Sequence, residues 1–295
     1  MMDKSTTFSH KKVLTFVVLT FVLTALFDIP EVILKPTGKI DRLFITAAMW
    51  CPAIAALITK RIFNESLSDL GWRVKSVKYL LWAYAVPIMY ALIGYLFIWI
   101  MGYGVFYNTD FVRSIAVSFG LPHLSPAAII TIYVLFAGIF GMVASCSTAL
   151  GEEIGWRGFL TPELFKKYGY IKTSLIIGII WAVWHYTVLI FGNYNNGTPF
   201  WYGLICFTFM VIAASFIFVW FRMKSGSLFP AMILHASHNL YIQVIFDPLT
   251  KANAHTPWFA NEFGCVIPLV TGIFAIYFIC RRGELSQYKL PFVTI

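Results

Sequence analysis

Long apolar runs, separated by short polar connections, follow one another along almost the whole chain. A helix needs about 20 apolar residues to cross the hydrocarbon core of a bilayer, which is about 30 Å thick. By this criterion the pattern predicts about eight membrane-spanning helices and no soluble domain, so the expected fold class is an all-α polytopic integral membrane protein. The predicted spans are Val13–Phe27, Leu43–Ile58, Tyr79–Met101, a helix beginning at Ala127, Ser174–Phe191, Trp201–Phe221, Leu228–Phe246 and Phe259–Cys280.

The composition supports a membrane protein and argues against a nucleic-acid partner. Of the 295 residues, 59% are hydrophobic and 12% are charged, which is about half the charged fraction of a soluble domain. The net charge of +9 is explained by basic residues that flank apolar spans on the cytoplasmic side. The five cysteines stand alone, without the spacing of a metal site, so we expect them to behave as small apolar side chains.

The distribution of Lys and Arg over the connections predicts the orientation in the membrane. Basic residues are frequent before the first span, after the second, fourth and sixth spans, and in the C-terminal tail, whereas the alternate connections hold few. The connection between the first two spans is an exception, with Lys35, Lys39 and Arg42. The positive-inside rule therefore places both termini in the cytoplasm, and we expect the chain in the inner or plasma membrane of the cell.

The chain divides into three parts by its pattern. Residues 1–126 are expected to form about three spanning helices and an amphipathic cytoplasmic loop, 127–246 a core with polar insertions, and 247–295 the last span and a cytoplasmic tail. The first apolar run has no small-residue cleavage site, so we interpret it as a retained span that is bordered by Asp28.

Two adjacent carboxylates and an arginine directly follow the apolar run of the fourth span. Ionisable groups at membrane depth are costly unless paired or hydrated, which makes Glu152, Glu153 and Arg157 a candidate functional site. Glu153 and Arg157 are four residues apart and are expected to pair, whereas Glu152 points about 100° away and can face something else. A simpler interpretation is an interfacial charge cluster that only marks the helix end.

The helix that carries these charges is expected to run from Ala127 to Leu160, which at 1.5 Å per residue is about 50 Å. This length exceeds the membrane core, so either its last turns reach a cytoplasmic vestibule or the helix is tilted. Pro162 is expected to end the helix, and a short interfacial helix is expected to follow and to close at Gly169.

Histidines interrupt two further apolar runs. His185 lies well inside the fifth span on the face of Trp181, and in the seventh span His235 shares a face with Asn239, with His238 close by. Each histidine alone is as readily explained by a hydrogen bond to a neighbouring helix. Because the fourth span ends, and the fifth and seventh begin, on the cytoplasmic side, the three insertions are expected to meet in the cytoplasmic half of the membrane.

Such a set of groups suits hydrolysis. A carboxylate can act as general base toward a water molecule, and a neutral imidazole beside it can orient that water or share its proton. A second imidazole and an amide N–H can donate hydrogen bonds to the oxyanion of a tetrahedral intermediate. The three insertions therefore predict one hydrolytic centre.

The motifs resemble those of the CPBP family, also called the Abi family, which includes type II CAAX prenyl endopeptidases and bacteriocin-processing proteins. The family pattern is EExxxR, then an aromatic residue with three residues between it and a His, then HxxxN or HxxxD. The pattern occurs here, in the same order and spacing, as Glu152-Glu153-xxx-Arg157, Trp181-xxx-His185 and His235-xxx-Asn239.

This resemblance implies an intramembrane glutamic endopeptidase that needs no cofactor, with residues 127–246 as its catalytic core. It implies that Glu152 and His185 activate the water and that His235 and Asn239 form the oxyanion hole. The residues implied to support the site are Glu153, Arg157 and Trp181. The site is expected to open toward the cytoplasm.

A metal is the alternative to this mechanism, because some family members have also been described as metalloproteases. The chain lacks HExxH, yet its histidines and a carboxylate could in principle ligate zinc. The alternative ligand set is Glu152, His185, His235 and His238. His238 matches no family position, so its role is open.

Two other functional classes also fit the pattern. One is a catalytically silent scaffold or bacteriocin-immunity factor, and the other is a proton-coupled transporter, since intramembrane Glu and His residues also form proton relays. The chain shows no pair of interrupted helices in symmetric halves, which argues against transport. The expected partners are the lipid bilayer and a peptide or membrane-protein substrate that is lipidated or bears a leader. Substrate identity and oligomeric state do not follow from the sequence.

Overall fold

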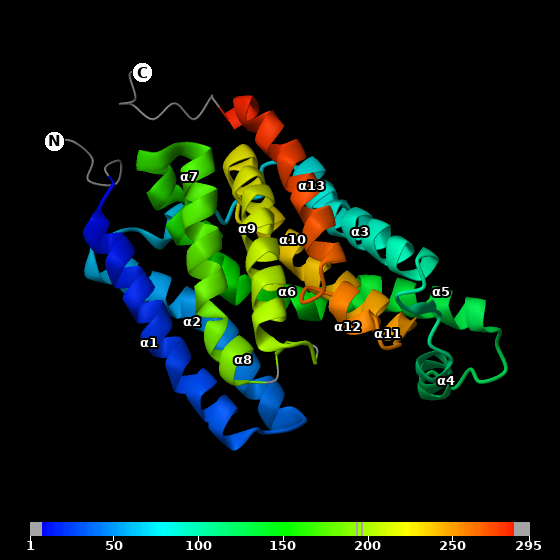
Figure 1. Cartoon of the computed structure of the whole chain (residues 1–295). Helices are drawn as coiled ribbons and strands as arrows, with labels where there is room; N and C mark the ends of the chain where they lie inside the picture. The colour runs from blue at the N-terminus through cyan, green and yellow to red at the C-terminus, as the bar shows by residue number, and fades with distance from the viewer. Residues whose placement is uncertain (1–7, 193, 196, 286–295) are drawn as a thin grey trace.

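Helices account for nearly all of the computed structural model, which describes residues 8–192, 194–195 and 197–285 (Figure 1). The long helices are α1 (His10–Leu34), α2 (Lys39–Ile62), α3 (Val77–Ile100), α7 (Thr161–Trp184), α9 (Phe200–Ser225) and α13 (Val266–Cys280). The shorter α-helices are α4 (Thr109–Ser118), α5 (Pro126–Phe136), α6 (Met142–Glu153), α8 (Tyr186–Phe191), α10 (Phe229–Asn239), α11 (Asp247–Leu249) and α12 (Thr256–Phe259). The π-helical segments are η2 (Ala137–Gly141), η3 (Ile154–Leu160) and η4 (Leu240–Phe246), and the 3₁₀ segments are η1 (Leu67–Leu70) and η5 (Arg281–Leu285). The predicted all-α class is confirmed, and the described residues add only one antiparallel pair, β1 (Val105–Phe106) and β2 (Thr250–Lys251).

Six helical segments in the described part of the chain are long and apolar enough to cross a membrane. They are His10–Leu34, Lys39–Ile62, Val77–Ile100, Pro126–Trp184, Phe200–Ser225 and Val266–Leu285. The segment Pro126–Trp184 contains the fourth predicted span and most of the fifth, and the seventh predicted span is helical as α10 and η4. The polytopic membrane class is therefore confirmed, while the count of eight spans and the cytoplasmic termini stay predictions.

Helix α6, which carries the paired carboxylates, lies at the centre of the helix bundle. It packs against α2 and α10, while α7 packs against α9, and α13 packs against both α9 and α3. The described ends of the chain, Phe8 and Leu285, lie at one end of the bundle, and the turn between α1 and α2 lies at the opposite end (Figure 1). The helices that carry the motifs thus pack together: α6 contacts α10, and η3, which follows α6, contacts α7.

Helix α1 is longer than the sequence pattern predicts. The expected border at Asp28 is wrong, because the helix continues through Pro30 to Leu34 and ends at Lys35, whose left-handed backbone (φ 44°) lets its N–H donate to the carbonyl of Glu31. A proline is tolerated in a long helix when its neighbours absorb the lost hydrogen bond. The extension places the Asp28 side chain on a helix face inside the protein, where it is 5% exposed.

The helix break expected at Pro162 is also wrong, because a π-helical turn carries the chain from α6 into α7. In a π-helix an N–H donates to the carbonyl five residues earlier, and Thr161 bonds the carbonyl of Trp156 in this way. Pro162 has no N–H to offer the carbonyl of Arg157, and the Arg222 Nε–H donates to it instead at 2.8 Å. The expected break at Gly169 is confirmed, with φ 65° and ψ −171°.

Two glycines let α6 and η3 approach α2 closely. A Cβ atom on Gly151 would lie 2.7 Å from the carbonyl oxygen of Met49, and a Cβ on Gly155 would lie 2.5 Å from Cβ of Pro52. The two glycines are four residues apart on one face, the arrangement that permits backbone contact between membrane helices. Close packing at Gly151 and Gly155 therefore fixes the position of the intervening Glu152 and Glu153.

Replacing Gly155 by Ala is expected to destabilise the fold by about 1–3 kcal/mol, the usual cost of overpacking. Gly158→Ala is the matched control, because the nearest atoms to its added Cβ lie at 3.4 Å, an ordinary contact. Thermal unfolding of the purified proteins in detergent measures both. Equal midpoints for the two variants would show that the Gly155 contact with α2 does not support the fold.

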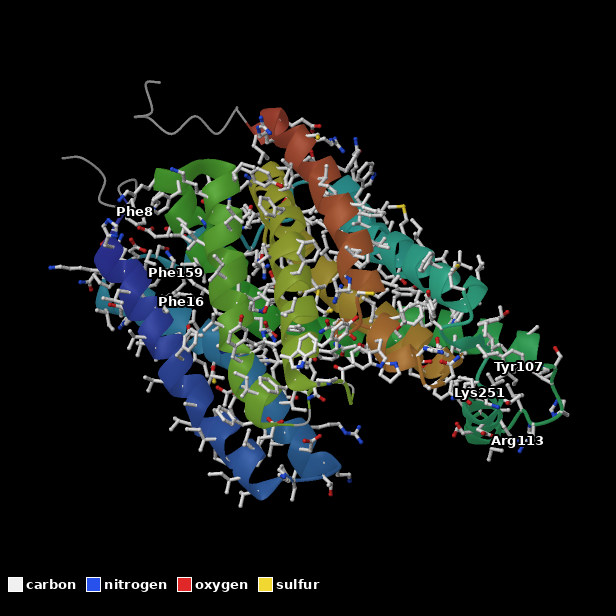
Figure 2. All side chains as sticks on the ribbon, in the orientation of Figure 1. Phe8, Phe16, Tyr107, Arg113, Phe159 and Lys251 are labelled. Carbon is white, nitrogen blue, oxygen red and sulfur yellow. The ribbon has the colours of Figure 1, made fainter. Side chains whose placement is uncertain are left out.

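Aromatic side chains fill the contact between α1 and the centre of the molecule. The rings of Phe16 and Phe159 lie 5.0 Å apart, and Phe16 also packs edge-on against Trp156 at 5.7 Å (Figure 2). At the far end from α1, the side chains of Tyr107, Arg113 and Lys251 lie near α4 (Figure 2). The wide separation of these two regions leaves the motif residues between them.

Candidate active site

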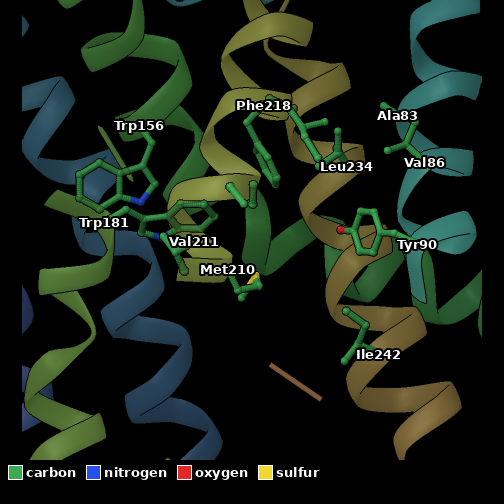
Figure 3. Packing of buried hydrophobic residues seen from close by; sticks show 14 of the residues in the cluster. Ala83, Val86, Tyr90, Trp156, Trp181, Met210, Val211, Phe218, Leu234 and Ile242 are labelled. Atoms are coloured by element: carbon green, nitrogen blue, oxygen red, sulfur yellow. The ribbon is translucent and has the colours of Figure 1, made fainter. Parts of the chain in front are cut away.

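Glu152 is buried at the C-terminal end of α6, with a side chain that is held by two indoles. Its Oε2 atom accepts hydrogen bonds from Nε1 of Trp181 at 2.7 Å and from Nε1 of Trp156 at 3.2 Å. Figure 3 shows the two tryptophans side by side in the core. Because both bonds go to Oε2, the Oε1 atom is left to act on a molecule in the cavity that Glu152 lines.

Glu153 forms the ion pair that the sequence predicts. Its Oε1 atom lies 2.8 Å from Nη1 of Arg157, and neither side chain is exposed. The same oxygen accepts a hydrogen bond from Nδ1 of His235 at 2.9 Å. The Arg157 guanidinium lies between the rings of Trp181 and Phe218, 4.2 Å from each centroid, a stacking that a planar cation favours.

The hydrogen bonds of two histidines decide which ring nitrogen faces the cavity. His185 lies just after α7, and its Nδ1 donates to the carbonyl of Trp181 at 2.9 Å, so the neutral ring has its lone pair on Nε2. His235 donates from Nδ1 to Glu153, so its Nε2 donates a hydrogen bond only when the ring is an imidazolium. Neutral His185 can thus accept a proton at Nε2, whereas His235 can donate from Nε2 once its ring is protonated beside Glu153.

His238 belongs to a separate buried network that the sequence does not reveal. Its Nδ1 lies 2.6 Å from the hydroxyl of Tyr90, and its Nε2 lies 3.0 Å from Oε1 of Glu262. The amide of Gln243 donates to the same oxygen at 2.8 Å. Glu262 falls inside the predicted eighth span, and an ionisable group at that position is the signal that could have identified it.

One cavity of about 260 Å³ brings the motif residues together. Glu152, His185, His235 and Asn239 all line it, whereas Glu153 and Arg157 are not among its lining residues. Its aromatic walls include Trp181, Trp184, Tyr194, Phe207 and Phe218. The arrangement thus separates residues that can touch a bound molecule from a buried ion pair behind them.

Trp181 connects the three motifs. Its indole N–H donates to Glu152, its carbonyl accepts from His185, and its ring stacks on Arg157 and lies edge-on to His235 at 5.4 Å. The contacts use three parts of the residue, the N–H, the carbonyl and the ring, so a phenylalanine would keep the ring contacts and the carbonyl but lose the N–H. Trp181 is therefore placed to fix both the carboxylate and the two imidazoles.

Replacing Trp181 by Phe is expected to lower kcat/KM of any hydrolysis at this site by about 10- to 100-fold. A hydrogen bond to a charged group is worth roughly 1.5–3 kcal/mol, and Glu152 loses its shorter one. Trp220→Phe is a control, since its indole donates to the carbonyl of Arg281, far from the cavity. Unchanged kinetics for Trp181→Phe would rule out a positioning role for this N–H.

The alternative zinc ligands do not gather into a metal site. Within the described residues, no group of three or more His, Cys, Asp or Glu side chains has a geometry that could hold a metal ion. His238 has both ring nitrogens in hydrogen bonds, to Tyr90 and to Glu262, and would have to break one of them to bind zinc. The residues named as an alternative ligand set therefore do not fit a shared metal.

Comparisons with known proteins find similarity in the part of the chain that holds the motif residues. Residues 137–241 match the family model described as type II CAAX prenyl endopeptidase Rce1-like. A segment of 94 residues is 33% identical to CAAX prenyl protease 2 of Methanococcus maripaludis, and this alignment covers 30% of the chain and 34% of the relative. The match thus spans about a third of the length of that curated relative.

The matched segment holds every motif residue from Glu152 to Asn239. Asp28, Glu31 and Glu262, which also line the cavity, lie outside it. Through residues 137–241, the predicted likeness of this chain to the CPBP family of membrane proteins is confirmed.

Proposed function

We propose that this protein is an intramembrane endopeptidase that hydrolyses a peptide bond with a water molecule activated by Glu152. The observation that carries the proposal is the cavity lined jointly by Glu152 of α6, His185 between α7 and α8, and His235 and Asn239 of α10. The match to an endopeptidase family over the same residues supports it.

In the proposed first step, a water molecule lies between Glu152 and His185. The free Oε1 of Glu152 accepts a proton from this water, and Nε2 of His185, which carries a lone pair, accepts a hydrogen bond from it. The water oxygen then attacks the carbonyl carbon of the substrate. General acid–base catalysis of this kind contributes roughly 10²- to 10⁴-fold to the rate.

The attack places a negative charge on the substrate oxygen. Asn239 can donate its amide N–H to this oxyanion, and His235 can donate Nε2–H as an imidazolium, which the adjacent Glu153 carboxylate stabilises. Loss of one such donor typically costs about 3–4 kcal/mol. When the C–N bond breaks, the proton held by Glu152 passes to the leaving amine, and Glu152 returns to its carboxylate form.

The proposed substrate is a peptide that reaches the cavity from the membrane or its surface. The aromatic walls suit an apolar segment, and the relative's name, CAAX prenyl protease 2, makes a lipidated peptide one candidate. A leader-bearing peptide or a membrane protein is the other candidate from the motif resemblance. We also propose that the protein lies in the inner or plasma membrane of the cell.

The structure relates two of the sequence predictions to each other. Asp28, which lines the cavity, lies about 27 Å along α1 from its start at 1.5 Å per residue, and therefore close to the α1–α2 turn. The cavity thus extends toward the α1–α2 turn, away from the described termini. If substrate enters at that end, cytoplasmic termini and a cytoplasmic opening exclude each other, and only one of the two predictions can hold.

Two functional classes other than a peptidase, a silent scaffold and a proton-coupled transporter, are alternatives that experiments can separate from the proposal. A silent scaffold would use the same cavity for binding, and a proton-coupled transporter would use its carboxylates and histidines as a relay. Uptake assays in vesicles separate transport from hydrolysis, and peptide cleavage in detergent separates hydrolysis from binding.

The experiment that tests the proposal compares the protein termini of cells that express the wild-type chain with those of cells that express Glu152→Ala at a matched level. New termini that appear only with the wild type are the expected result. Identical termini, in a host that supplies candidate peptides, would contradict endopeptidase activity and favour the scaffold.

A further inference from the structure

The cavity continues beyond the motif residues to two carboxylates of α1. Asp28 and Glu31 line it together with Ile45 and Met49 of α2. Being three residues apart, Asp28 and Glu31 lie on neighbouring positions of one helix face. Both residues belong to α1 and lie outside the segment that matches the endopeptidase family.

The Asp28 carboxylate is buried without a partner. Its side chain is 5% exposed, and within the described residues no hydrogen bond or ion pair reaches it. Glu31 is close enough to repel it, and Asp41 in turn repels Glu31. A buried charge without a partner is costly, and a cation held in the cavity would compensate this cost.

Carboxylates are the predominant charged groups that line the cavity, and the lining cation of the proposed mechanism, the His235 imidazolium, is already hydrogen-bonded to Glu153. The lining carboxylates are Asp28, Glu31, Glu152 and Glu262, and the described residues that line the cavity include no Lys or Arg. Two of these four carboxylates already accept hydrogen bonds from protein groups: Glu152 accepts from two indoles, and Glu262 accepts from His238 and Gln243. The basic residues that follow α1 are exposed and, among the residues that the structure describes, form no ion pair with Asp28 or Glu31; they are Lys35, Lys39 and Arg42.

A tryptophan connects these free carboxylates to the catalytic candidates. The indole of Trp184 donates to the hydroxyl of Thr24 at 2.8 Å, one turn before Asp28 on the same face of α1. The ring of Trp184 also packs edge-on against His185 at 4.6 Å and lines the cavity. An aromatic face between His185 and Asp28 suits the aliphatic stem and the cationic head of a basic side chain.

We propose that Asp28 and Glu31 form a substrate subsite for a lysine or arginine side chain, which lies along Trp184 while the peptide bond is held at Glu152. The inference rests on the proposed endopeptidase function and deepens it by naming a substrate class. A peptide with a basic residue close to the cleaved bond is preferred, and one with an acidic residue at that position is repelled.

The test uses the full-length protein in detergent and synthetic peptides of one apolar sequence with a single variable residue: Lys, Arg, norleucine or Glu. The variable residue is moved along the sequence, and kcat/KM is measured for each peptide. At one position, Lys and Arg are expected to exceed norleucine by about tenfold or more, the size of one hydrogen bond to a charged group. Asp28→Asn and Glu31→Gln are each expected to reduce that ratio toward one.

Asp110→Asn is the matched control, because Asp110 is exposed in the first turn of α4 and does not line the cavity. It is expected to keep the wild-type ratio. The proposal is overturned if Lys and norleucine peptides are cleaved equally at every position, or if Asp28→Asn and Glu31→Gln slow both peptides to the same extent.

A binding measurement separates failure of the subsite from failure of the endopeptidase proposal. The same peptides, fluorescently labelled, are titrated against Glu152→Gln and against Glu152→Gln combined with Asp28→Asn. Tighter binding of the Lys peptide that depends on Asp28 supports the subsite even if the wild type cleaves nothing, a result that would sink the endopeptidase alone. Equal affinities for Lys and norleucine peptides would refute the subsite.

Discussion

Glu152→Gln is expected to abolish peptide cleavage while the protein stays folded. The amide oxygen can still accept from the indoles of Trp156 and Trp181, so the packing around it is kept. The amide cannot take a proton from water, and loss of general-base catalysis lowers kcat by roughly 10²- to 10⁴-fold. Single-turnover cleavage by the purified variant, with its thermal unfolding midpoint, measures both parts of this expectation.

A second buried glutamate provides the control for Glu152. Glu163 of α7 is 3% exposed, accepts from the backbone of Ser9 and pairs with Lys166, and it does not line the central cavity. Glu163→Gln is expected to keep the cleavage rate, even if it lowers stability. Full activity of Glu152→Gln would assign the base to another group, and equal losses for the two variants would point to a general folding effect.

Arg157→Met is expected to have the largest effect on stability, roughly 3–5 kcal/mol. The substitution leaves Glu153 charged in a site where neither partner is exposed, and breaking one side of such a buried pair typically costs this much. It also removes the cation from between Trp181 and Phe218. Thermal unfolding in detergent and the yield of folded protein measure the loss.

A double substitution separates the ion pair from the packing around it. Glu153→Gln combined with Arg157→Met removes both charges and keeps an acceptor for Nδ1 of His235, so it is expected to recover much of the lost stability. Arg157→Lys keeps the charge but not the planar stacking, and it is expected to fall between the wild type and Arg157→Met. Wild-type stability of Arg157→Met would show that the pair does not hold the site together.

Helical spacing explains why the Glu153–Arg157 pair could be predicted. Residues four apart on a helix meet on one face whatever surrounds them, and apolar surroundings leave opposite charges little alternative to pairing. The same local geometry separates Glu152 from Glu153, and the cavity is lined by Glu152 and not by Glu153. The catalytic roles assigned to the motif residues stay proposals, which the kinetic experiments above address.

The course of the chain through residues 154–169 could be predicted only in part. Proline usually breaks a helix because it lacks an N–H, yet a π-helical turn at η3 carries the chain through, and the side chain of Arg222 satisfies the freed carbonyl of Arg157. Arg222 is distant in sequence, so no local rule reveals this compensation. Gly169, by contrast, breaks the helix as predicted, because its positive φ is a property of the residue itself.

The sequence alone determined those features of this protein that depend on composition and on spacing along one helix. These are the membrane class, the apolar helices, the pairing of Glu153 with Arg157, and the three motifs that resemble a peptidase family. Only the tertiary structure decided which side chains from different helices share a cavity. In the folded protein Asp28 and Glu31 of α1 line the same cavity as the motif residues, and this cavity extends away from the described termini. His238 is hydrogen-bonded to Tyr90 and Glu262. The reason is physical: contacts within a helix repeat every three or four residues, whereas contacts between helices depend on how closely backbones approach, as Gly151 and Gly155 allow here.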